Sequence, residues 1–120
     1  MRAEVIRVVR AYLEAVEDND FEALPLHPDV VFESPLNSIR GIVACREALA
    51  KFAPILKSVE IEHLTADDEG CAAVLNLDTV FGVVPFLEYF RVKDGQIVSV
   101  RAYYDPRPML ERKAPIQSRR

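Results

Sequence analysis

The chain has few of the residues that build disulfides and metal sites, with two cysteines and two histidines among 120 residues. Cys45 and Cys71 lie far apart and form no Cys-x-x-Cys pair, so we expect both to be small reduced core residues. His27 and His63 are isolated, and neither belongs to a His-x-His or Cys–His cluster. The sequence therefore predicts no metal site.

An excess of positive charge is also missing. The chain has 15 Lys and Arg against 19 Asp and Glu, a formal net charge of −4, which argues against nucleic acid as a partner. Its longest apolar run, residues 80–87, contains Gly82 and Pro85 and is far shorter than the roughly 20 residues that a membrane helix needs. Charged residues are spread through positions 1–20, which disfavours a signal peptide. These features predict a cytoplasmic protein with no membrane partner.

Half of the residues are hydrophobic, which is enough for one modest core in a chain of this length. No internal repeat, linker or low-complexity stretch divides the sequence. We therefore expect one domain over residues 1–107, followed by a basic tail over residues 108–120.

Apolar residues at helical spacing predict a first helix over residues 3–17, a short turn of helix over 21–24, and a third helix from about Ile42. The buried stripe of the first comprises Val5, Val9, Tyr12, Leu13 and Val16, and that of the third comprises Val43, Ala48, Leu49, Phe52 and Leu56. His27, between two prolines, is expected in a loop.

Residues 30–34, 59–64 and 71–81 alternate as strands, and residues 85–105 read as a hairpin. Asp94-Gly95 supplies the positive φ angles that its two-residue turn requires. The order of elements predicts an α+β fold, with three helices packed on one side of a curved, mostly antiparallel sheet.

The hairpin has an acid on an otherwise apolar face. Alternation along its first strand places Glu88 with Phe86 and Phe90. If this face is the interior, poor solvation of the carboxylate should raise the pKa of Glu88. On the second strand, Val100, Ala102 and Tyr104 share one face.

The strand at 71–81 contains a second candidate acid, Asp78, which shares a face of the strand with Asn76. Such groups are costly to bury without partners. A turn near Gly82 and Val83 would place Asp78 roughly opposite Glu88. The two carboxyl groups would then titrate as a coupled pair that keeps one proton near neutral pH.

Structural explanations compete with these assignments. The polar pair on strand 71–81 could face a dimer partner on the convex side of the sheet. Glu88 could form an ion pair with Arg101 or Arg40, and Tyr12 could simply fill the core. The sequence alone leaves these alternatives open.

The order of elements, with FEALPLHPDVVFESP before the long helix and DGQIVSVRAYYDP at the end, resembles the nuclear-transport-factor-two-like superfamily. More narrowly, it resembles the SnoaL-like and ketosteroid-isomerase-like proteins, over roughly residues 4–107. The resemblance implies a cone-shaped α+β barrel with a pocket between the helices and the concave sheet face, commonly in a homodimer. This scaffold carries isomerases, cyclases, epoxide hydrolases, dehydratases and non-catalytic binders, so the fold alone does not define a reaction.

Ketosteroid isomerases pair a tyrosine of the first helix with a protonated acid on a later strand to bind an oxyanion. The segments VVRAYLEAV and LEYFRV place Tyr12 and Glu88 at those two positions. The isomerase base, an aspartate before proline, is replaced by Ser34. The limonene epoxide hydrolase pattern is also incomplete, because Asn76 stands for its arginine and Ala102 for its last aspartate.

Together these observations predict a SnoaL-like acid–base enzyme of isomerase, cyclase or lyase type that uses no metal or organic cofactor. Its substrate would be a small hydrophobic molecule with a carbonyl group. Glu88 and Asp78 would transfer protons, and Tyr12 and Asn76 would donate hydrogen bonds to a developing oxyanion. The other predicted substrate-binding residues are Ser34, Phe32, Phe52, Phe86, Phe90, Val100, Ala102 and Tyr104. The alternatives are a non-catalytic small-molecule binder and a protein-interaction module.

Overall fold

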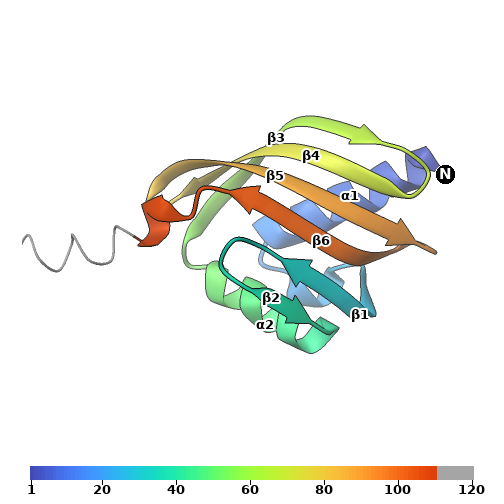
Figure 1. Cartoon of the computed structure of the whole chain (residues 1–120), viewed down its shortest axis with the longest axis horizontal. Helices are drawn as coiled ribbons and strands as arrows, with labels where there is room; N and C mark the ends of the chain where they lie inside the picture. The colour runs from blue at the N-terminus through green and yellow to red at the C-terminus, as the bar shows by residue number, and fades with distance from the viewer. Residues whose placement is uncertain (111–120) are drawn as a thin grey trace, which may run out of the picture.

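Helices and strands alternate through residues 1–110, the part of the chain that the computed structural model describes (Figure 1). The helical segments are α1 (Arg2–Glu17), the 3-10 turn η1 (Phe21–Ala23) and α2 (Ile42–Phe52). The strands are β1 (Leu26–Glu33), β2 (Ser38–Arg40), β3 (Leu56–Ala66), β4 (Gly70–Thr79), β5 (Gly82–Lys93) and β6 (Gln96–Tyr104). Of the predicted basic tail, residues 111–120 lie outside the described part.

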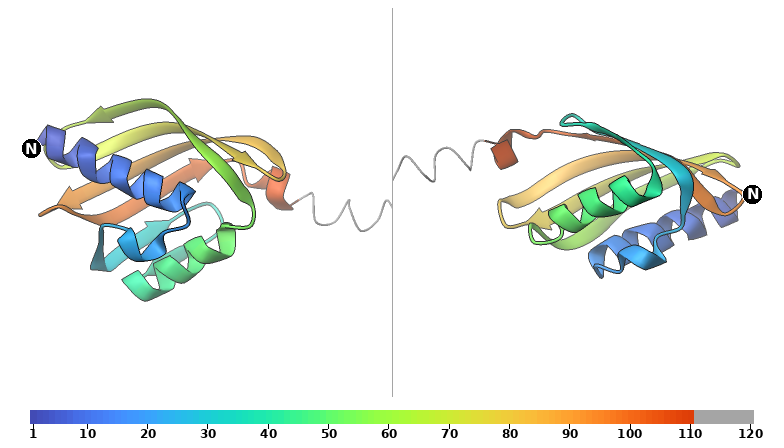
Figure 2. Two further views of the ribbon diagram at one scale, coloured as in Figure 1. Left: turned by 180° about the vertical axis from the view of Figure 1, so that it is seen from behind. Right: turned by 90° about the horizontal axis from the view of Figure 1, so that it is seen from below.

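The strands form one six-stranded sheet in the order β2-β1-β6-β5-β4-β3. Neighbouring strands are antiparallel except β1 and β6, which are parallel. The sheet curves around the helices without closing, and both helices lie on its concave side (Figure 2). The predicted α+β architecture, with helical segments on one side of a mostly antiparallel sheet, is confirmed.

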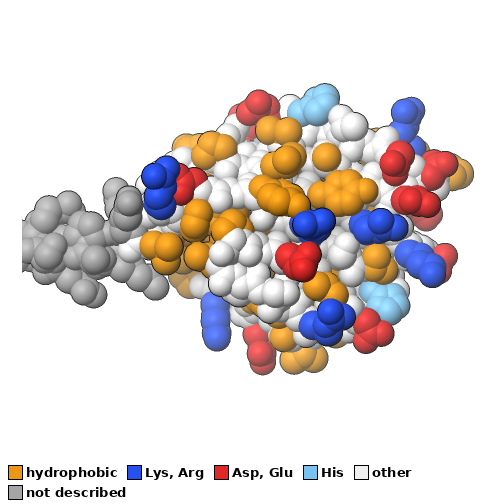
Figure 3. All heavy atoms as spheres, in the orientation of Figure 1, with side chains coloured by type: hydrophobic (Ala, Val, Ile, Leu, Met, Phe, Trp, Pro, Cys, Tyr) orange, Lys and Arg blue, Asp and Glu red, His pale blue; other side chains and the backbone are white. Residues whose placement is uncertain are grey.

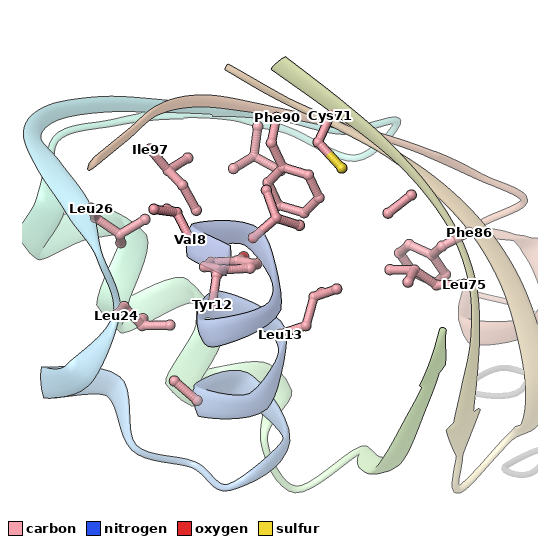
Figure 4. Packing of buried hydrophobic residues seen from close by; sticks show 14 of the residues in the cluster. Val8, Tyr12, Leu13, Leu24, Leu26, Cys71, Leu75, Phe86, Phe90 and Ile97 are labelled. Atoms are coloured by element: carbon pink, nitrogen blue, oxygen red, sulfur yellow. The ribbon is translucent and has the colours of Figure 1, made fainter. Parts of the chain in front are cut away.

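The apolar stripe of α1 closes the narrow end of this concave side. Val5, Val9, Tyr12 and Leu13 are buried as predicted, and Val8 is buried with them. Figure 4 shows Val8 and Tyr12 directed from α1 toward side chains of the sheet. Burial of each such aliphatic side chain stabilises the fold by about 1.5–3 kcal/mol, so α1 is held on the sheet mainly by this packing.

The hairpin of β5 and β6 has the predicted turn, since Asp94 and Gly95 have φ angles of 53° and 76°. The register shifts by one residue between Arg91 and Val92, and beyond this shift Glu88 lies opposite Ala102 and Phe86 opposite Tyr104. The hairpin therefore determines which side chains of β5 and β6 face the helices.

Three local predictions were wrong. His27 lies in β1 and not in a loop, because β1 already pairs with β6 at Leu26 and Ile97. The register is irregular after Leu26, so Pro28 falls where no ladder hydrogen bond is needed. Strand β2, which pairs with β1, was not predicted. In α2, the predicted buried residue Val43 is exposed and Cys45 is buried instead, while Leu56 lies in β3 and not in the helix.

Substitutions of Val9 in α1 and Val43 in α2 test this packing. Val9→Ala should lower the free energy of unfolding by roughly 2 kcal/mol, because Val9 is 0% exposed and its lost methyl groups leave a cavity. Val43→Ala should change it by less than about 0.5 kcal/mol, because Val43 is 66% exposed. Urea unfolding followed by circular dichroism measures both. Equal losses would contradict the observed face of α2.

Candidate functional site

A cavity of about 640 Å³ opens between α1, α2 and the concave face of the sheet. Small-molecule sites are typically in the range of roughly 300–1,000 Å³. Its walls are mainly apolar, with side chains from both helices and from all six strands, among them Leu13, Val16, Leu49, Phe52, Leu75, Leu77, Phe86 and Val100. The cavity is therefore suited to a small hydrophobic molecule.

Most of the predicted substrate-binding residues do line this cavity: Phe32, Ser34, Phe52, Phe86, Val100, Ala102 and Tyr104. Phe90 does not, because it is fully buried in the core beyond the cavity floor. Its ring contacts Tyr12 edge to face, with centroids 5.3 Å apart. Phe90 thus supports a cavity residue and does not itself border the cavity.

Glu88 projects from β5 into the cavity, in the row of inward side chains between Phe86 and Phe90. Within residues 1–110 its carboxyl group forms no hydrogen bond and no salt bridge. Burial away from water raises its pKa to about 7, because the ionised form loses solvation. Glu88 can therefore hold or release a proton near neutral pH.

The predicted ion-pair alternative for Glu88 is wrong. The Arg101 guanidinium lies 3.5 Å from a carboxylate oxygen of Glu33, on the other face of the sheet. Arg40 is exposed on β2 and forms no salt bridge to Glu88. No cation of the described residues compensates the Glu88 charge at contact distance.

Tyr12 extends from α1 to the cavity floor and is almost completely buried. Its pKa lies well above the ordinary value, first because of burial and then because of the nearby Glu88 and Cys45 charges. Its ring also packs edge to face against Phe32, at a centroid distance of 6.3 Å. The phenol is a neutral hydrogen-bond donor, and its hydroxyl makes no hydrogen bond to another described residue.

The predicted juxtaposition of Asp78 and Glu88 is wrong. Asp78 pairs with Val83 across β4 and β5, whereas Glu88 pairs with Ala73. The connecting turn consists of Val80 and Phe81, not of Gly82 and Val83 as the prediction required. Val83 lies five positions before Glu88 on β5, and this odd offset places Asp78 on the opposite face of the sheet from Glu88.

Asn76 is on the same outer face, so its predicted role toward an oxyanion in the cavity is wrong as well. Its side-chain amide donates hydrogen bonds to Glu60 at 3.0 Å and to Glu62 at 2.9 Å, both on β3. Side chains of Leu75 and Leu77 take the inward positions of β4. The sequence reasoning had identified both faces of this strand correctly and assigned the wrong one to the cavity.

Ser34 and Tyr104 form a second polar position in the cavity wall. The Tyr104 ring is stacked on Phe86, with centroids 4.1 Å apart and planes 16° apart. Burial raises the pKa of Tyr104, a hydrogen bond with Ser34 opposes the rise, and the Glu88 charge adds to it. The cavity lining also includes Leu36, Met109 and Leu110.

The histidines have local partners. The His63 ring lies 2.8 Å from the Thr65 hydroxyl, and His27 Nδ1 accepts a hydrogen bond from the Asp29 backbone N–H. No cluster of three His, Cys, Asp or Glu residues suited to a metal ion occurs in residues 1–110. In the same residues, no helix is long and apolar enough to cross a membrane.

Helices that cover the concave face of a curved six-stranded sheet, with a cavity between the layers, define the nuclear-transport-factor-two-like fold. Within this class the chain belongs to the SnoaL-like domain family, which matches residues 9–100. No curated protein sequence matches the chain.

Solved structures support the fold. A protein from Kribbella flavida DSM 17836 has a TM-score of 0.89 and 23% identity, over 93% of this chain and 95% of that one. An LEH-like epoxide hydrolase from M. tuberculosis has a TM-score of 0.76 and 25% identity, over 99% and 98%. A second Kribbella flavida protein, described as a candidate ketosteroid isomerase, has a TM-score of 0.80 and 18% identity, over 87% and 79%.

The raised pKa of Glu88 makes folding stability depend on pH. Because the folded protein binds the Glu88 proton more tightly than the unfolded chain, stability should fall as pH rises from about 4.5 to about 7. Glu88→Gln should remove this fall and gain on the order of 1–3 kcal/mol over the wild type at pH 8. Thermal unfolding across pH, with carbon NMR of the carboxyl groups, measures it. Asp78→Asn changes a residue on the outer face and should not alter this dependence of stability on pH. A Glu88 pKa near the ordinary value for glutamate would contradict burial of its carboxyl group in the cavity.

Proposed function

We propose that the protein is an acid–base enzyme of isomerase, cyclase or lyase type that needs no cofactor and acts on a small hydrophobic molecule with a carbonyl group. The proposal is supported by one observation above all. Glu88, with a pKa of about 7 and no hydrogen bond or salt bridge among the described residues, lines the same apolar cavity as Tyr12, and its charge raises the pKa of that phenol. Because Asp78 lies outside the cavity, a single carboxyl group would both remove and return the proton.

The reaction would begin with the ionised form of Glu88, which makes up about half of the molecules near pH 7. This carboxylate takes a proton from a carbon next to the substrate carbonyl, and the electron pair of the broken C–H bond moves to the carbonyl oxygen. Tyr12 donates a hydrogen bond to the resulting oxyanion and so lowers its energy. Glu88 then returns the proton to another carbon, or the enolate attacks an electrophilic carbon in the same molecule.

A non-catalytic binding protein is the second candidate. Ser34 occupies the position before proline where ketosteroid isomerases have their base, and Ser34 makes its own hydrogen bonds within a turn. The cavity would then hold an apolar ligand, with Glu88 and Tyr12 contributing only hydrogen bonds.

Hydrogen exchange separates these two functions without knowledge of the substrate. The wild type should speed up deuterium incorporation at the carbon next to the carbonyl of bicyclic enones in D₂O, measured by NMR. Glu88→Gln should lower the rate by a factor of about 100 or more, and Tyr12→Phe by about 10 to 100. The rate should rise with pH through about 7, because the basic form of Glu88 is the active one.

Asp78→Asn is the matched control, because it removes a carboxylate from the other face of the sheet. This variant should keep the wild-type exchange rate. If the enones bind and exchange no faster than in buffer, with equal affinity in Glu88→Gln, the protein is a binder and the enzymatic proposal fails.

We also propose a cytoplasmic location, which cell fractionation would test. A further proposal is a homodimer that forms through the outer face of the sheet. The outer face exposes Val83, Leu87 and Tyr103 by 64%, 42% and 48%. Figure 3 shows hydrophobic side chains grouped at the centre of this face, with charged residues around them. Exposed apolar patches often mark protein contacts.

Light scattering after gel filtration tests the dimer. The wild type should have twice the mass of one chain at micromolar concentration, and Leu87→Asp should reduce it to a monomer with an unchanged circular dichroism spectrum. Val43→Asp, an exposed valine of α2, is the control and should remain dimeric. A monomeric wild type would contradict the proposal.

A further inference from the structure

The proposed chemistry leaves Tyr104, the second phenol of the cavity, without a role. Tyr104 follows Ala102 by two positions on β6, and Ala102 is the residue paired with Glu88. At roughly 3.4 Å per residue, Tyr104 lies about 7 Å farther along the sheet than Glu88. Its ring is held by stacking on Phe86, so the position of its hydroxyl group is well defined.

Ser34 determines what the Tyr104 hydroxyl can do. Ser34 Oγ accepts hydrogen bonds from the backbone N–H groups of Leu36 at 3.2 Å and Asn37 at 3.3 Å. A hydroxyl group has two acceptor lone pairs and one proton. With both lone pairs in use, Ser34 can only donate, either to Asn37 Oδ1 at 3.2 Å or to the Tyr104 oxygen.

In both arrangements the proton of the Tyr104 hydroxyl has no acceptor within residues 1–110. Burial raises the pKa of Tyr104, so the group remains a neutral donor at physiological pH. A donor that is half-buried in an apolar wall is stabilised by an acceptor oxygen inside the cavity. The cavity thus has two donor positions, one at Tyr12 and the other at Tyr104.

We propose that Tyr104 donates a hydrogen bond to a second oxygen atom of the ligand, apart from the carbonyl oxygen that meets Tyr12. The ligand class is then an apolar molecule with two oxygen functions, such as a diketone or a hydroxyketone. The position of the first oxygen rests on the proposed function, whereas binding of the second oxygen requires no turnover.

The probes are the bicyclic enone octalone and the matching enedione, which carries a second ketone on its other ring. Calorimetry with the full chain should show that the enedione binds about three to ten times more tightly than octalone, as one net hydrogen bond predicts. Tyr104→Phe keeps the ring that stacks on Phe86 and should bind both compounds equally. Tyr103→Phe, on the outer face, should keep the preference for the enedione.

Carbon NMR of the phenol ring gives a second measurement, because the chain has only four tyrosines. The enedione should shift the Cζ signal of Tyr104 and octalone should not. Equal affinities in the wild type, a preference that survives in Tyr104→Phe, or no binding of either compound would each overturn the proposal. Tighter binding of the enedione without hydrogen exchange would support the second oxygen site and refute the enzyme. Hydrogen exchange with equal binding of both compounds would support the enzyme and refute the second oxygen site.

Discussion

The site depends on a carboxyl group that receives no partner from the protein. Glu88 is held in the apolar wall because the Asp94-Gly95 turn and the register shift between Arg91 and Val92 together align β5 with β6. Glu88 could reach solvent on the outer face only if the strand shifted by one residue, which would also expose Phe86 and Phe90. The packing of these two aromatic rings therefore stabilises the fold while it keeps an acid in a poorly solvated position.

Local patterns were sufficient for most of the fold. The stripe of α1, the alternation of β4 and β5 and the Asp94-Gly95 turn are visible in the sequence, because each depends on residues close together in the chain. The start of β1 and all of β2 were missed for the opposite reason. Leu26 is in a strand because of its pairing with the distant Ile97, across an irregular register that the sequence does not reveal.

The same distinction explains the outcome at the candidate site. Glu88 and Tyr12 were placed correctly, since each follows from the face of a single element. The placement of Asp78 required the exact turn between two strands, and an odd error in register moved it to the other face. One signal was available: Glu60 and Glu62 alternate with Val59 and Ile61 on β3, which is typical of a strand whose polar face is exposed, and Asn76 bonds to that face.

Three polar groups in the cavity wall, those of Glu88, Tyr12 and Tyr104, restrict what can occupy it. A pure hydrocarbon of suitable size would fill the apolar walls, but it would also cover Glu88, Tyr12 and Tyr104 and give them no acceptor. Each polar group that is buried in this way costs about 1–3 kcal/mol. An oxygenated molecule of the same shape avoids that cost, so the cavity discriminates against hydrocarbons through the penalty of uncompensated burial more than through any single attractive contact.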